Sequence, residues 1–553
     1  MKPKKVVIVG GVAGGASAAA RLRRLDEDME IILFERGEHI SYANCGLPYY
    51  IGGVIEDRED LLVQTPEGMK QRFNIDIRVN SEVLDIDVEK KQVQVKDRVT
   101  GESYFESYDK LILSPGAEPL RPSIPGIEGK NIFTLRNVKD TFDIEDYIIS
   151  GQCKDAVVVG GGFIGLEMAE NLCHRGLKVT IVEMADQIMA PLDYEMAAIL
   201  HEYLKTKDIK LVLKDGVKAF AKEGEKTLVE LQSGKKLETD LVILAIGVRP
   251  EITLAKKAGL EIGETRGIKV NKHLQTSNPH IYAVGDAIEI VDFINGSPAL
   301  IPLAGPANKQ GRIAANHICG IEDTYKATQG TSIVKLFDIT AAVTGNNEKT
   351  LQKFNIPYQC VHVHSPSHAT YYPGATEMVI KLLFSPEDGQ LLGAQIVGYK
   401  GVDKRIDVLA TAIRGKMTVY DLQELELAYA PPYSSAKDPV NMAGYVASNT
   451  LMGHNPIIQW YHVQELDREN TLILDTRTRE EYSMGAIPGS INIPVDELRE
   501  NLDKIEEYKD KDVVLYCRSG QRSYIATRIL MQKGFNKVRN LSGGYLTWSI
   551  ANK

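Results

Sequence analysis

Two of the six cysteines stand where a thiol could do chemistry. Cys45 lies in the irregular polar segment SYANCGLPYY, and Cys517 follows the apolar run DVVLY and opens the loop CRSGQRS. A thiolate at either place could exchange with a disulfide or carry a sulfane sulfur. The other cysteines are scattered, without a CxxC pair or zinc-finger spacing, so neither a disulfide framework nor a metal site is expected. For Cys45, burial as a small hydrophobic residue is the alternative.

The loop after Cys517 suits an anionic sulfur. The amides of such a strand-to-helix loop converge on one point, and the helix that follows adds positive potential. Arg518 and Arg522 are expected to strengthen that field. A cysteine phosphatase would need an arginine where Ser523 stands, so this shorter loop fits a single sulfur atom better. A catalytically inactive domain used for binding is the other alternative.

A glycine-rich turn between an apolar strand and a helix indicates a dinucleotide site. Gly160, Gly162 and Gly165 fit G-x-G-x-x-G, and Glu183 closes the following strand, VTIVE. The glycines allow close approach to a pyrophosphate held at the helix N-terminus, and the carboxylate takes the ribose hydroxyls. No arginine follows Glu183 to neutralise a 2'-phosphate, so NADH is expected and NADPH is less favoured.

The same pattern stands at the beginning of the chain, in KKVVIVGGVAGGASAAARLRRL. Gly10 and Gly15 hold the first and third glycine places, and Val12 takes the second. Glu35 supplies the ribose acceptor at the end of IILFE. Two such units predict two dinucleotides, and the usual pair is FAD to accept a hydride and a nicotinamide to deliver it.

Two further strand ends are expected to lead the chain to the flavin. The strand of KLILSPGAEP runs into Ser114 and Gly116, and NPHIYAVGDA contains Gly285 and Asp286. The second segment resembles the second flavin motif of the pyridine nucleotide-disulfide oxidoreductases, in which the aspartate binds the ribityl chain. That resemblance extends over about residues 1 to 450.

The resemblance also implies how the chain is divided. It implies an FAD-binding domain at 1–150 and 255–328, an NAD(P)H-binding domain at 151–254 and a dimerisation domain at 329–451. A further α/β pattern at 457–553, with LDTRTREEY and LSGGYLTW, is similar to single-domain rhodaneses. The predicted fold class is α/β, with two Rossmann-like domains, an α+β dimerisation domain and a C-terminal rhodanese domain.

The run SYANCGLPY around Cys45 closely resembles the coenzyme A disulfide reductases and their relatives that reduce CoA persulfide. The resemblance implies a homodimer in which Tyr371 and Tyr429 reach the thiol of the other subunit. Ordinary interface aromatics are the alternative for these tyrosines. The resemblance also implies CoA contacts at Ser17, Arg21, Arg24, Ser41, Asn44, Asn308 and Lys437.

The sequence departs from that family at three points. Arg21 and Asn308 differ in type from the residues of the best-known reductases. A lysine of the family falls on Phe73, which leaves Lys70 or Arg72 as substitutes. The resemblance therefore does not establish CoA contacts at these three positions.

One part of this site follows from the residues themselves. Ser17, Arg21 and Arg24 are spaced i, i+4 and i+7, so they share one face of the first helix. That face could bind phosphate groups. The alternative is that it is a solvent-exposed arginine face of a surface helix with no ligand.

The charge balance of the chain argues against a nucleic-acid partner. The formal net charge is -9, whereas a nucleic-acid binder relies on many Lys and Arg contacts to phosphate. The N-terminus lacks the apolar region of a signal peptide, and no apolar stretch approaches the ~20 residues of a membrane span. We therefore expect a cytoplasmic protein with neither a nucleic-acid partner nor a membrane span.

Together the patterns predict an NADH-dependent reductase of CoA persulfide, polysulfide or CoA disulfide. NADH would reduce FAD, the flavin would reduce a mixed disulfide at Cys45, and Cys45 would attack the sulfur substrate. Cys517 would carry persulfide sulfur to or from the CoA thiol. A flavin NADH oxidase that reduces oxygen to water is the rival enzyme, and a non-catalytic redox sensor is the alternative of another class.

Overall fold

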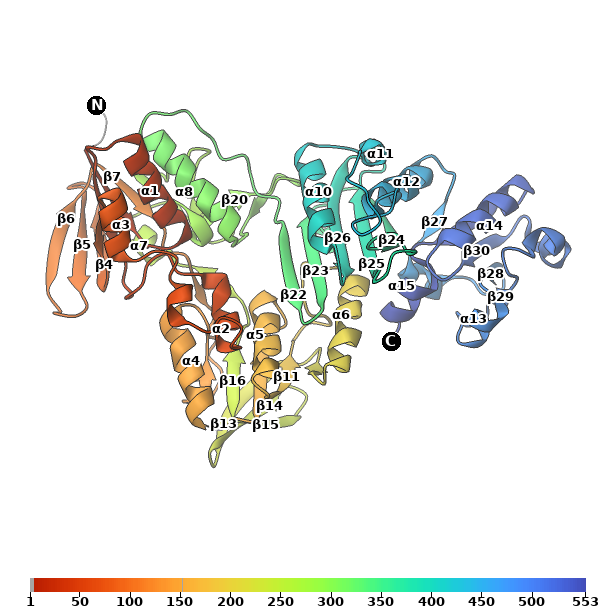
Figure 1. The fold of residues 1–553 in the computed structure, drawn as a ribbon, viewed down its shortest axis with the longest axis horizontal. Helices are drawn as coiled ribbons and strands as arrows, with labels where there is room; N and C mark the ends of the chain where they lie inside the picture. The colour runs from red at the N-terminus through yellow and green to blue at the C-terminus, as the bar shows by residue number, and fades with distance from the viewer. Residues whose placement is uncertain (1–3, 152) are drawn as a thin grey trace. The chain divides into compact units, whose positions relative to one another are not determined.

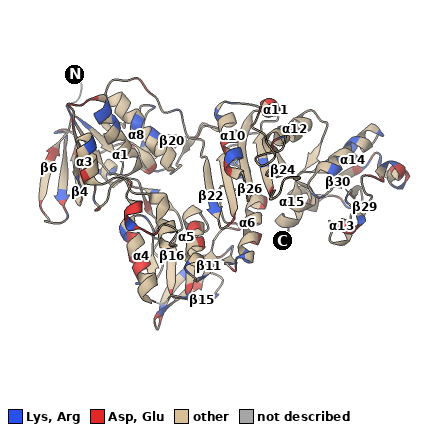
Figure 2. Ribbon diagram, in the orientation of Figure 1, with Lys and Arg blue, Asp and Glu red and all other residues tan. Residues whose placement is uncertain are grey.

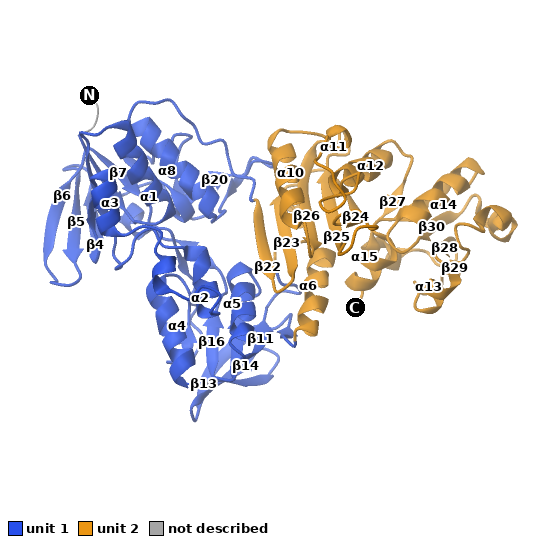
Figure 3. Ribbon diagram, in the orientation of Figure 1, with its two compact units in different colours: residues 1–188, 208–330 blue, residues 189–207, 331–553 orange. Residues whose placement is uncertain are grey.

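The computed structural model describes residues 4–151 and 153–553. The chain forms two compact units, Met1–Ile188 with Asp208–Gly330 and Met189–Lys207 with Thr331–Lys553 (Figure 3). The helices and strands carry the labels of Figure 1. Across the residues described, no helix is both long and apolar enough to cross a membrane.

The first unit begins with a five-stranded sheet in the order β19-β7-β1-β2-β3, in which all neighbours are parallel. Its strands are β1 (Lys5–Val9), β2 (Glu30–Phe34), β3 (Asp76–Arg78), β7 (Lys110–Leu113) and β19 (Ile281–Ala283). The apolar runs of β1 and β7 are buried, as expected for a parallel sheet covered by helices. Because the strands are parallel, their carboxyl ends meet at one edge, where Gly10, Ser114 and Gly285 follow.

Two helices beside this sheet come from distant parts of the chain. They are α1 (Ala13–Leu25) and α8 (Ala304–Ile318), which pack closely against each other. A three-stranded antiparallel sheet is inserted between β3 and β7, made of β4 (Ser81–Asp87), β5 (Gln92–Asp97) and β6 (Ser103–Ser107). The contact between α1 and α8 places residues of the N-terminal fingerprint beside a helix that follows the second flavin motif.

A second five-stranded parallel sheet has the order β12-β11-β10-β16-β9. Its strands are β9 (Ile132–Phe133), β10 (Asp155–Val159), β11 (Lys178–Val182), β12 (Lys210–Val212) and β16 (Leu241–Leu244). Helix α5 (Phe163–His174) follows β10 directly, and α4 (Val138–Gly151) precedes it. The strands β13 (Val217–Glu223), β14 (Lys226–Leu231) and β15 (Lys236–Thr239) form an antiparallel sheet beside this fold.

The second unit contains a five-stranded antiparallel sheet in the order β22-β23-β26-β25-β24. Its strands are β22 (Ser332–Leu336), β23 (Ile339–Gly345), β24 (Gln359–Pro366), β25 (Glu377–Phe384) and β26 (Leu391–Gly398). The helices with it are α6 (Tyr194–Thr206), α10 (Val402–Arg414), α11 (Val419–Glu424) and α12 (Pro439–Leu451). Residues 189–207, which include α6, cluster with this second unit.

The chain ends in a five-stranded parallel sheet in the order β27-β31-β30-β28-β29. Its strands are β27 (Ile457–Ile458), β28 (Thr471–Asp475), β29 (Ile491–Asn492), β30 (Asp512–Tyr516) and β31 (Lys537–Leu541). The helices are α13 (Arg479–Ser483), α14 (Gln521–Gln532) and α15 (Gly544–Ala551), and apolar clusters fill two sides of the sheet. The predicted fold class, two dinucleotide folds followed by an α+β and a C-terminal α/β domain, is confirmed.

Candidate active site

The two glycine turns have the same geometry. Gly10 and Gly160 have φ values of 100° and 107°, at which a side chain would be strained. A Cβ on Gly15 would stand 1.9 Å from the carbonyl oxygen of Gly10. The matching distance from Gly165 to Gly160 is 2.0 Å. The first and third glycines of each fingerprint are therefore required by the turn itself.

The second glycine position of the fingerprint is not required by the conformation of the turn. Gly162 and Val12 cap their helices with φ values of -81° and -109°, which any residue can adopt. A Cβ on Gly162 would meet no described atom within 4 Å. This open space at the start of α5 fits a pyrophosphate, which a helix N-terminus attracts. Val12 replaces the glycine of the first turn without backbone strain.

One carboxylate stands against each glycine turn. Glu35 accepts a hydrogen bond from the amide of Gly11 at 3.0 Å, and Glu183 accepts one from the amide of Gly161 at 2.8 Å. Each carboxylate lies at the end of the second strand of its sheet, where a ribose hydroxyl would be bound. Each glycine turn therefore has a carboxylate at the place where a bound dinucleotide would need one.

Residues of the two other strand ends gather at the edge beside Gly10. A Cβ on Gly10 would stand 2.1 Å from the carbonyl oxygen of Ser114, and Gly116 follows with φ of 72°. Gly285 begins the short helix η3 (Gly285–Ala287), which contains Asp286. Burial raises the pKa of the Asp286 carboxyl. A half-buried carboxyl at this edge fits a hydroxyl-bearing partner such as a ribityl chain.

Cys45 lies in the short helix η1 (Asn44–Gly46), directly before α2 (Leu47–Ile51). Its side chain reaches solvent, but the protein around it displaces enough water to raise the pKa of the thiol. The carboxylates of Glu167 and Asp286 add to that rise, and such influence falls with distance. The charge of Asp286, in the flavin motif, therefore acts on the Cys45 thiol.

Glu167 is a candidate functional residue that sequence analysis missed. It stands on α5, which packs against α2. Burial raises the pKa of Glu167 to about 7 and Glu170 adds to the rise, while a hydrogen bond from Tyr49 opposes it. A carboxyl that titrates near neutral pH beside a thiol can hold or release a proton there. Its place two residues after Gly165 was visible in the sequence, but the packing of α5 toward Cys45 was not.

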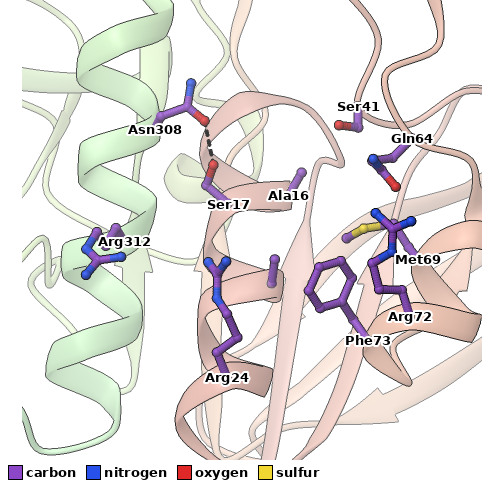
Figure 4. A pocket seen from close by; sticks show the side chains of 11 residues that line it. Ala16, Ser17, Arg24, Ser41, Gln64, Met69, Arg72, Phe73, Asn308 and Arg312 are labelled. Atoms are coloured by element: carbon purple, nitrogen blue, oxygen red, sulfur yellow. Dashed lines mark hydrogen bonds between the residues drawn. The ribbon is translucent and has the colours of Figure 1, made fainter.

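A cavity of about 370 Å³ opens among α1, α3 (Pro66–Phe73) and α8 (Figure 4). It brings together four of the residues implied by the resemblance, Ser17, Arg24, Ser41 and Asn308. Arg72, one of the two suggested substitutes, also lines it, together with Gln64, Met69 and Arg312, which were not foreseen. Figure 2 shows Lys and Arg side by side with few acidic residues on these helices.

Three guanidinium groups of this cavity lack an acidic partner. Among the described residues, Arg24, Arg72 and Arg312 have no carboxylate within salt-bridge distance. The pKa of neighbouring Arg21 is lowered, first by desolvation and then by the charges of Arg312 and Arg24. An uncompensated positive field of this kind suits the phosphate groups of a ligand.

Other residues implied by the resemblance lie around this cavity. The Ser17 hydroxyl donates to Oδ1 of Asn308 at 2.5 Å, which joins α1 to α8. Arg21 instead donates from Nε to Oδ1 of Asn316 at 2.8 Å and does not line the cavity. Asn44 stands in η1 beside Cys45, also outside the lining. Their CoA contacts stay predictions.

The remaining residues that the resemblance implies for the thiol and CoA site lie in the second unit. The hydroxyls of Tyr371 and Tyr429 are 2.8 Å apart, and the two side chains are 74% and 48% exposed. Lys437 directly precedes Asp438, the N-cap of α12. The tyrosines thus form a pair on the surface of this unit, and their action on another subunit stays a prediction.

Cys517 stands at the end of β30 with its side chain buried. The amide of Gly520 donates to its Sγ at 3.2 Å, and α14 begins directly after Gly520. The start of α15 packs under the loop, because a Cβ on Gly544 would stand 2.6 Å from the carbonyl oxygen of Cys517. The loop can present its amides to a sulfur atom at this thiol.

Both arginines of the loop are paired with carboxylates outside it. Arg518 lies 2.9 Å from Oε2 of Glu377, and Arg522 makes two hydrogen bonds to Glu481, at 2.6 and 2.8 Å. Sequence analysis expected the two arginines to add positive potential at Cys517. The pKa of Arg522 is raised first by its hydrogen bonds to Glu481 and also by the charge of Cys517 and a hydrogen bond to it, so this arginine faces the thiol as well. The potential that the two arginines add there stays a prediction.

The fold and site define an oxidoreductase with two dinucleotide sites and an appended α/β domain. The sequence model of the family described as pyridine nucleotide-disulphide oxidoreductase matches residues 4–311, and the model of its dimerisation domain matches residues 331–439. A rhodanese-like domain matches residues 461–551. The chain belongs to the pyridine nucleotide-disulphide oxidoreductases and carries a C-terminal rhodanese-like domain.

Curated relatives and solved structures agree with this assignment. The coenzyme A disulfide reductase of Staphylococcus haemolyticus is 39% identical over 80% of this chain and 99% of its own length. A protein named NADH oxidase from Methanocaldococcus jannaschii is 38% identical over 81% of this chain and 99% of its own length. The resemblance to the coenzyme A disulfide reductases is thereby confirmed.

Two solved structures include the C-terminal domain. The crystal structure of reduced Bacillus anthracis CoADR-RHD is similar with a TM-score of 0.97 and 55% identity, covering 100% of this chain and 98% of that one. An NAD-dependent persulfide reductase from A. fulgidus gives a TM-score of 0.92 and 39% identity, covering 98% of this chain and 100% of that one.

Proposed function

We propose that the chain is an NADH-dependent FAD enzyme that reduces CoA persulfide or polysulfide, and CoA disulfide, through Cys45, while its rhodanese-like domain transfers sulfane sulfur. One observation carries the proposal. A cavity lined by three arginines that have no carboxylate partner among the described residues includes Ser41, which stands four residues before the thiol of Cys45. Its volume, about 370 Å³, is within the usual range for small-molecule sites.

The chemistry of the cavity suits CoA. Its arginines would bind the phosphates of the nucleotide end, and the joined Ser17 and Asn308 offer polar contacts. Ser41 is held in a left-handed conformation, with φ of 46°, by a hydrogen bond from its amide to the carbonyl of Gly11 at 2.8 Å. This turn directs the chain from the cavity toward Cys45, which is the direction that a pantetheine arm would follow.

The residues present fit both cofactors. FAD would be held by the first glycine turn, Glu35 and Asp286, and NADH by the second turn and Glu183. When bound, the pair supplies two electrons by hydride transfer. The preference for NADH follows from Glu183, which would repel a 2'-phosphate, and from Met184, which is 71% exposed and carries no charge to neutralise it.

The step assigned to Cys45 is nucleophilic. Its thiolate attacks the inner sulfur of CoA persulfide, the sulfur–sulfur bond breaks, and hydrosulfide leaves, so that Cys45 and CoA share a mixed disulfide. Two electrons and one proton then release the CoA thiol and restore the Cys45 thiolate. With CoA disulfide the same attack expels a CoA thiolate. Glu167, which titrates near neutral pH beside the thiol, is placed to take or give the proton.

Cys517 has a separate task in this proposal. Its thiolate would hold a sulfane sulfur against the amide of Gly520 and pass it to a CoA thiol. The fusion favours persulfide over simple disulfide reduction, because a sulfur carrier has little to contribute to a pure disulfide reductase. We further propose a cytoplasmic homodimer, in which Tyr371 and Tyr429 serve the thiol of the other subunit.

The test is anaerobic NADH oxidation with CoA disulfide, CoA persulfide or polysulfide, followed by mass analysis of Cys45. We expect stoichiometric sulfide from the persulfide and a CoA adduct on Cys45. Cys45→Ser should abolish turnover, and Cys153→Ser, a change at a half-buried thiol elsewhere in the unit, should leave it intact. Full activity in Cys45→Ser would refute the proposal.

A flavin NADH oxidase is the second candidate, favoured by the relative of that name. The two activities differ in their electron acceptor. NADH consumption that requires oxygen, with no sulfide from any sulfur substrate, would establish the oxidase. The family assignment makes the chain an oxidoreductase, so a non-catalytic sensor is no longer supported.

A further inference from the structure

The guanidinium group of Arg405, on α10, is buried inside the second unit, and 1% of the residue is exposed. A buried charge has to be paired and hydrogen-bonded, because its removal from water is otherwise too costly. Asp438 supplies the opposite charge, with Oδ2 3.0 Å from Nη2 and Oδ1 3.4 Å from Nε. Nη1 donates to the carbonyl of Gly401 at 3.2 Å, and a Cβ on Gly401 would stand 2.1 Å from that nitrogen. The space around the guanidinium is therefore closely fitted to it.

Nη2 of Arg405 bonds to both chain segments that carry the tyrosine pair. It lies 2.9 Å from the carbonyl oxygen of Ser367, in the connection between β24 and β25 that contains Tyr371. It also lies 3.4 Å from the carbonyl oxygen of Tyr433, in the segment that follows Tyr429. One buried group thus holds the backbone of both segments whose tyrosine hydroxyls meet at 2.8 Å.

Ser434 completes this junction. Its carbonyl accepts a hydrogen bond from the amide of Ala369 at 3.1 Å, which joins the two segments directly. Its hydroxyl accepts from Nη2 of Arg405 at 3.2 Å and donates to Oδ2 of Asp438 at 2.7 Å. Burial alone would raise the pKa of Asp438, but the hydrogen bonds that it accepts lower it. The carboxyl therefore stays anionic opposite the guanidinium.

The tyrosine rings depend on this backbone for their places. Tyr371 is 74% exposed and Tyr429 is 48% exposed, so packing of the rings themselves holds them weakly. A shift of one segment by about 1 Å would break the hydrogen bond between the two hydroxyls. The accuracy of the pair therefore has to come from the segments beneath it.

We propose that Arg405 is a positioning residue, whose single guanidinium sets the places of Tyr371 and Tyr429. This inference rests on the function proposed above, in which the tyrosine pair serves the Cys45 thiol of the other subunit. Arg405 is buried and acts through the backbone carbonyls that it binds. Lysine cannot take over this task, because an ammonium group lacks the planar fork that joins the segments.

The experiment follows two half-reactions of the full-length, FAD-loaded protein by anaerobic stopped flow. These are reduction of the flavin by NADH and reoxidation of the reduced enzyme by CoA disulfide. We expect Arg405→Lys to slow reoxidation by about tenfold and to leave flavin reduction within about twofold, because only the tyrosine pair is misplaced. In a background of Tyr371→Phe and Tyr429→Phe, the same change should slow reoxidation by less than about twofold further, because the hydroxyls that Arg405 positions are absent.

Arg477→Lys is the matched control, since Arg477 is likewise buried and paired in the second unit. Its guanidinium bonds inside the rhodanese-like domain, to Asp475 at 2.6 Å and to the carbonyl of Gly485 at 2.7 Å. This variant should change reoxidation by CoA disulfide by less than about twofold, because it leaves the tyrosine segments in place.

Ser434→Ala decides the matter if Arg405→Lys does not fold. It removes one hydroxyl from the junction and keeps the carbonyl, so it should slow reoxidation by about threefold, and only when the tyrosine hydroxyls are present. If the loss is the same with and without those hydroxyls, or if Arg477→Lys causes an equal loss, the positioning inference is overturned while the role of the tyrosines stands. If the variant with both tyrosines replaced reoxidises as fast as the parent, the proposed role of the tyrosines fails, and the positioning inference fails with it.

Discussion

Nζ of Lys381 lies 2.5 Å from Oε1 of Glu195, although 186 residues separate the two in the chain. Solvent reaches neither, and Asp193 and Glu348 complete the site at 2.9 and 2.6 Å from the same nitrogen. Burial alone would lower the pKa of Lys381, but the carboxylates raise it well above its usual value. A buried ammonium therefore ties α6 to the antiparallel sheet of the second unit.

Replacing Lys381 should weaken the second unit strongly. Lys381→Met removes the cation and leaves buried carboxylates without their partner, which costs about 3–5 kcal/mol of unfolding free energy. Denaturant unfolding at pH 7 measures the change. The control is Lys207→Met, whose solvent-exposed pair with Asp338 should contribute little to the unfolding free energy. Equal losses in the two variants would contradict the assignment.

Gly162→Ala should separate ligand binding from folding. Its φ of -81° and the open space around it predict an unfolding free energy within about 0.5 kcal/mol of the parent. The added methyl group would occupy the space of the pyrophosphate, so KM for NADH should rise by roughly tenfold, which corresponds to about 1.4 kcal/mol. Steady-state kinetics with NADH varied checks this, and flavin content should not change. An unaltered KM would show that the space has another use.

The arginines of the cavity should differ in their effect on CoA substrates. Arg24→Gln and Arg312→Gln should each raise KM for CoA disulfide by about tenfold at low salt, and less at high salt. Arg21→Gln is the control, since Arg21 is bound to Asn316 and does not line the cavity. It should change KM by less than about threefold. A larger effect of Arg21→Gln than of Arg312→Gln would mean that the nucleotide end lies elsewhere.

Glu167 should control the reactivity of Cys45 in a pH-dependent way. Its pKa is about 7, so at higher pH it becomes anionic and opposes formation of the thiolate, whose pKa it raises. Glu167→Gln should therefore speed alkylation of Cys45 by iodoacetamide above pH 7 and change it little at pH 6. Rates measured from pH 6 to 9 by mass analysis test this. A constant ratio between variant and parent across the range would show that Glu167 acts through structure and not through its charge.

The dinucleotide folds could be predicted from sequence because their signals are local. A strand, three glycines, a helix and an acidic residue lie within a short stretch, and Gly160 and Glu183 meet through that stretch alone. The loop of Cys517 was visible for the same reason. In both cases the residues that do the work are neighbours in the chain.

What sequence could not supply depends on packing between distant segments. Arg312 joins the cavity only because α8 packs on α1, and Glu167 faces Cys45 only because α5 packs on α2. The carboxylates on Arg518 and Arg522 were equally hidden, since Glu377 stands 141 residues from its partner. Neither periodicity nor motif carries information on such pairs.

Two backbone groups on the outer edge of β24 are hydrogen-bonded to residues of the C-terminal domain. The carbonyl of Cys360 accepts a hydrogen bond from Gln459, and the amide of His362 donates to Ser542 at 2.9 Å. The Staphylococcus haemolyticus relative is matched over 99% of its length by 80% of this chain and so has little room for that domain. Ending the chain after α12 would therefore not be enough to make a shortened enzyme for crystallisation or biocatalysis. The outer edge of β24 would also have to be redesigned so that it tolerates water.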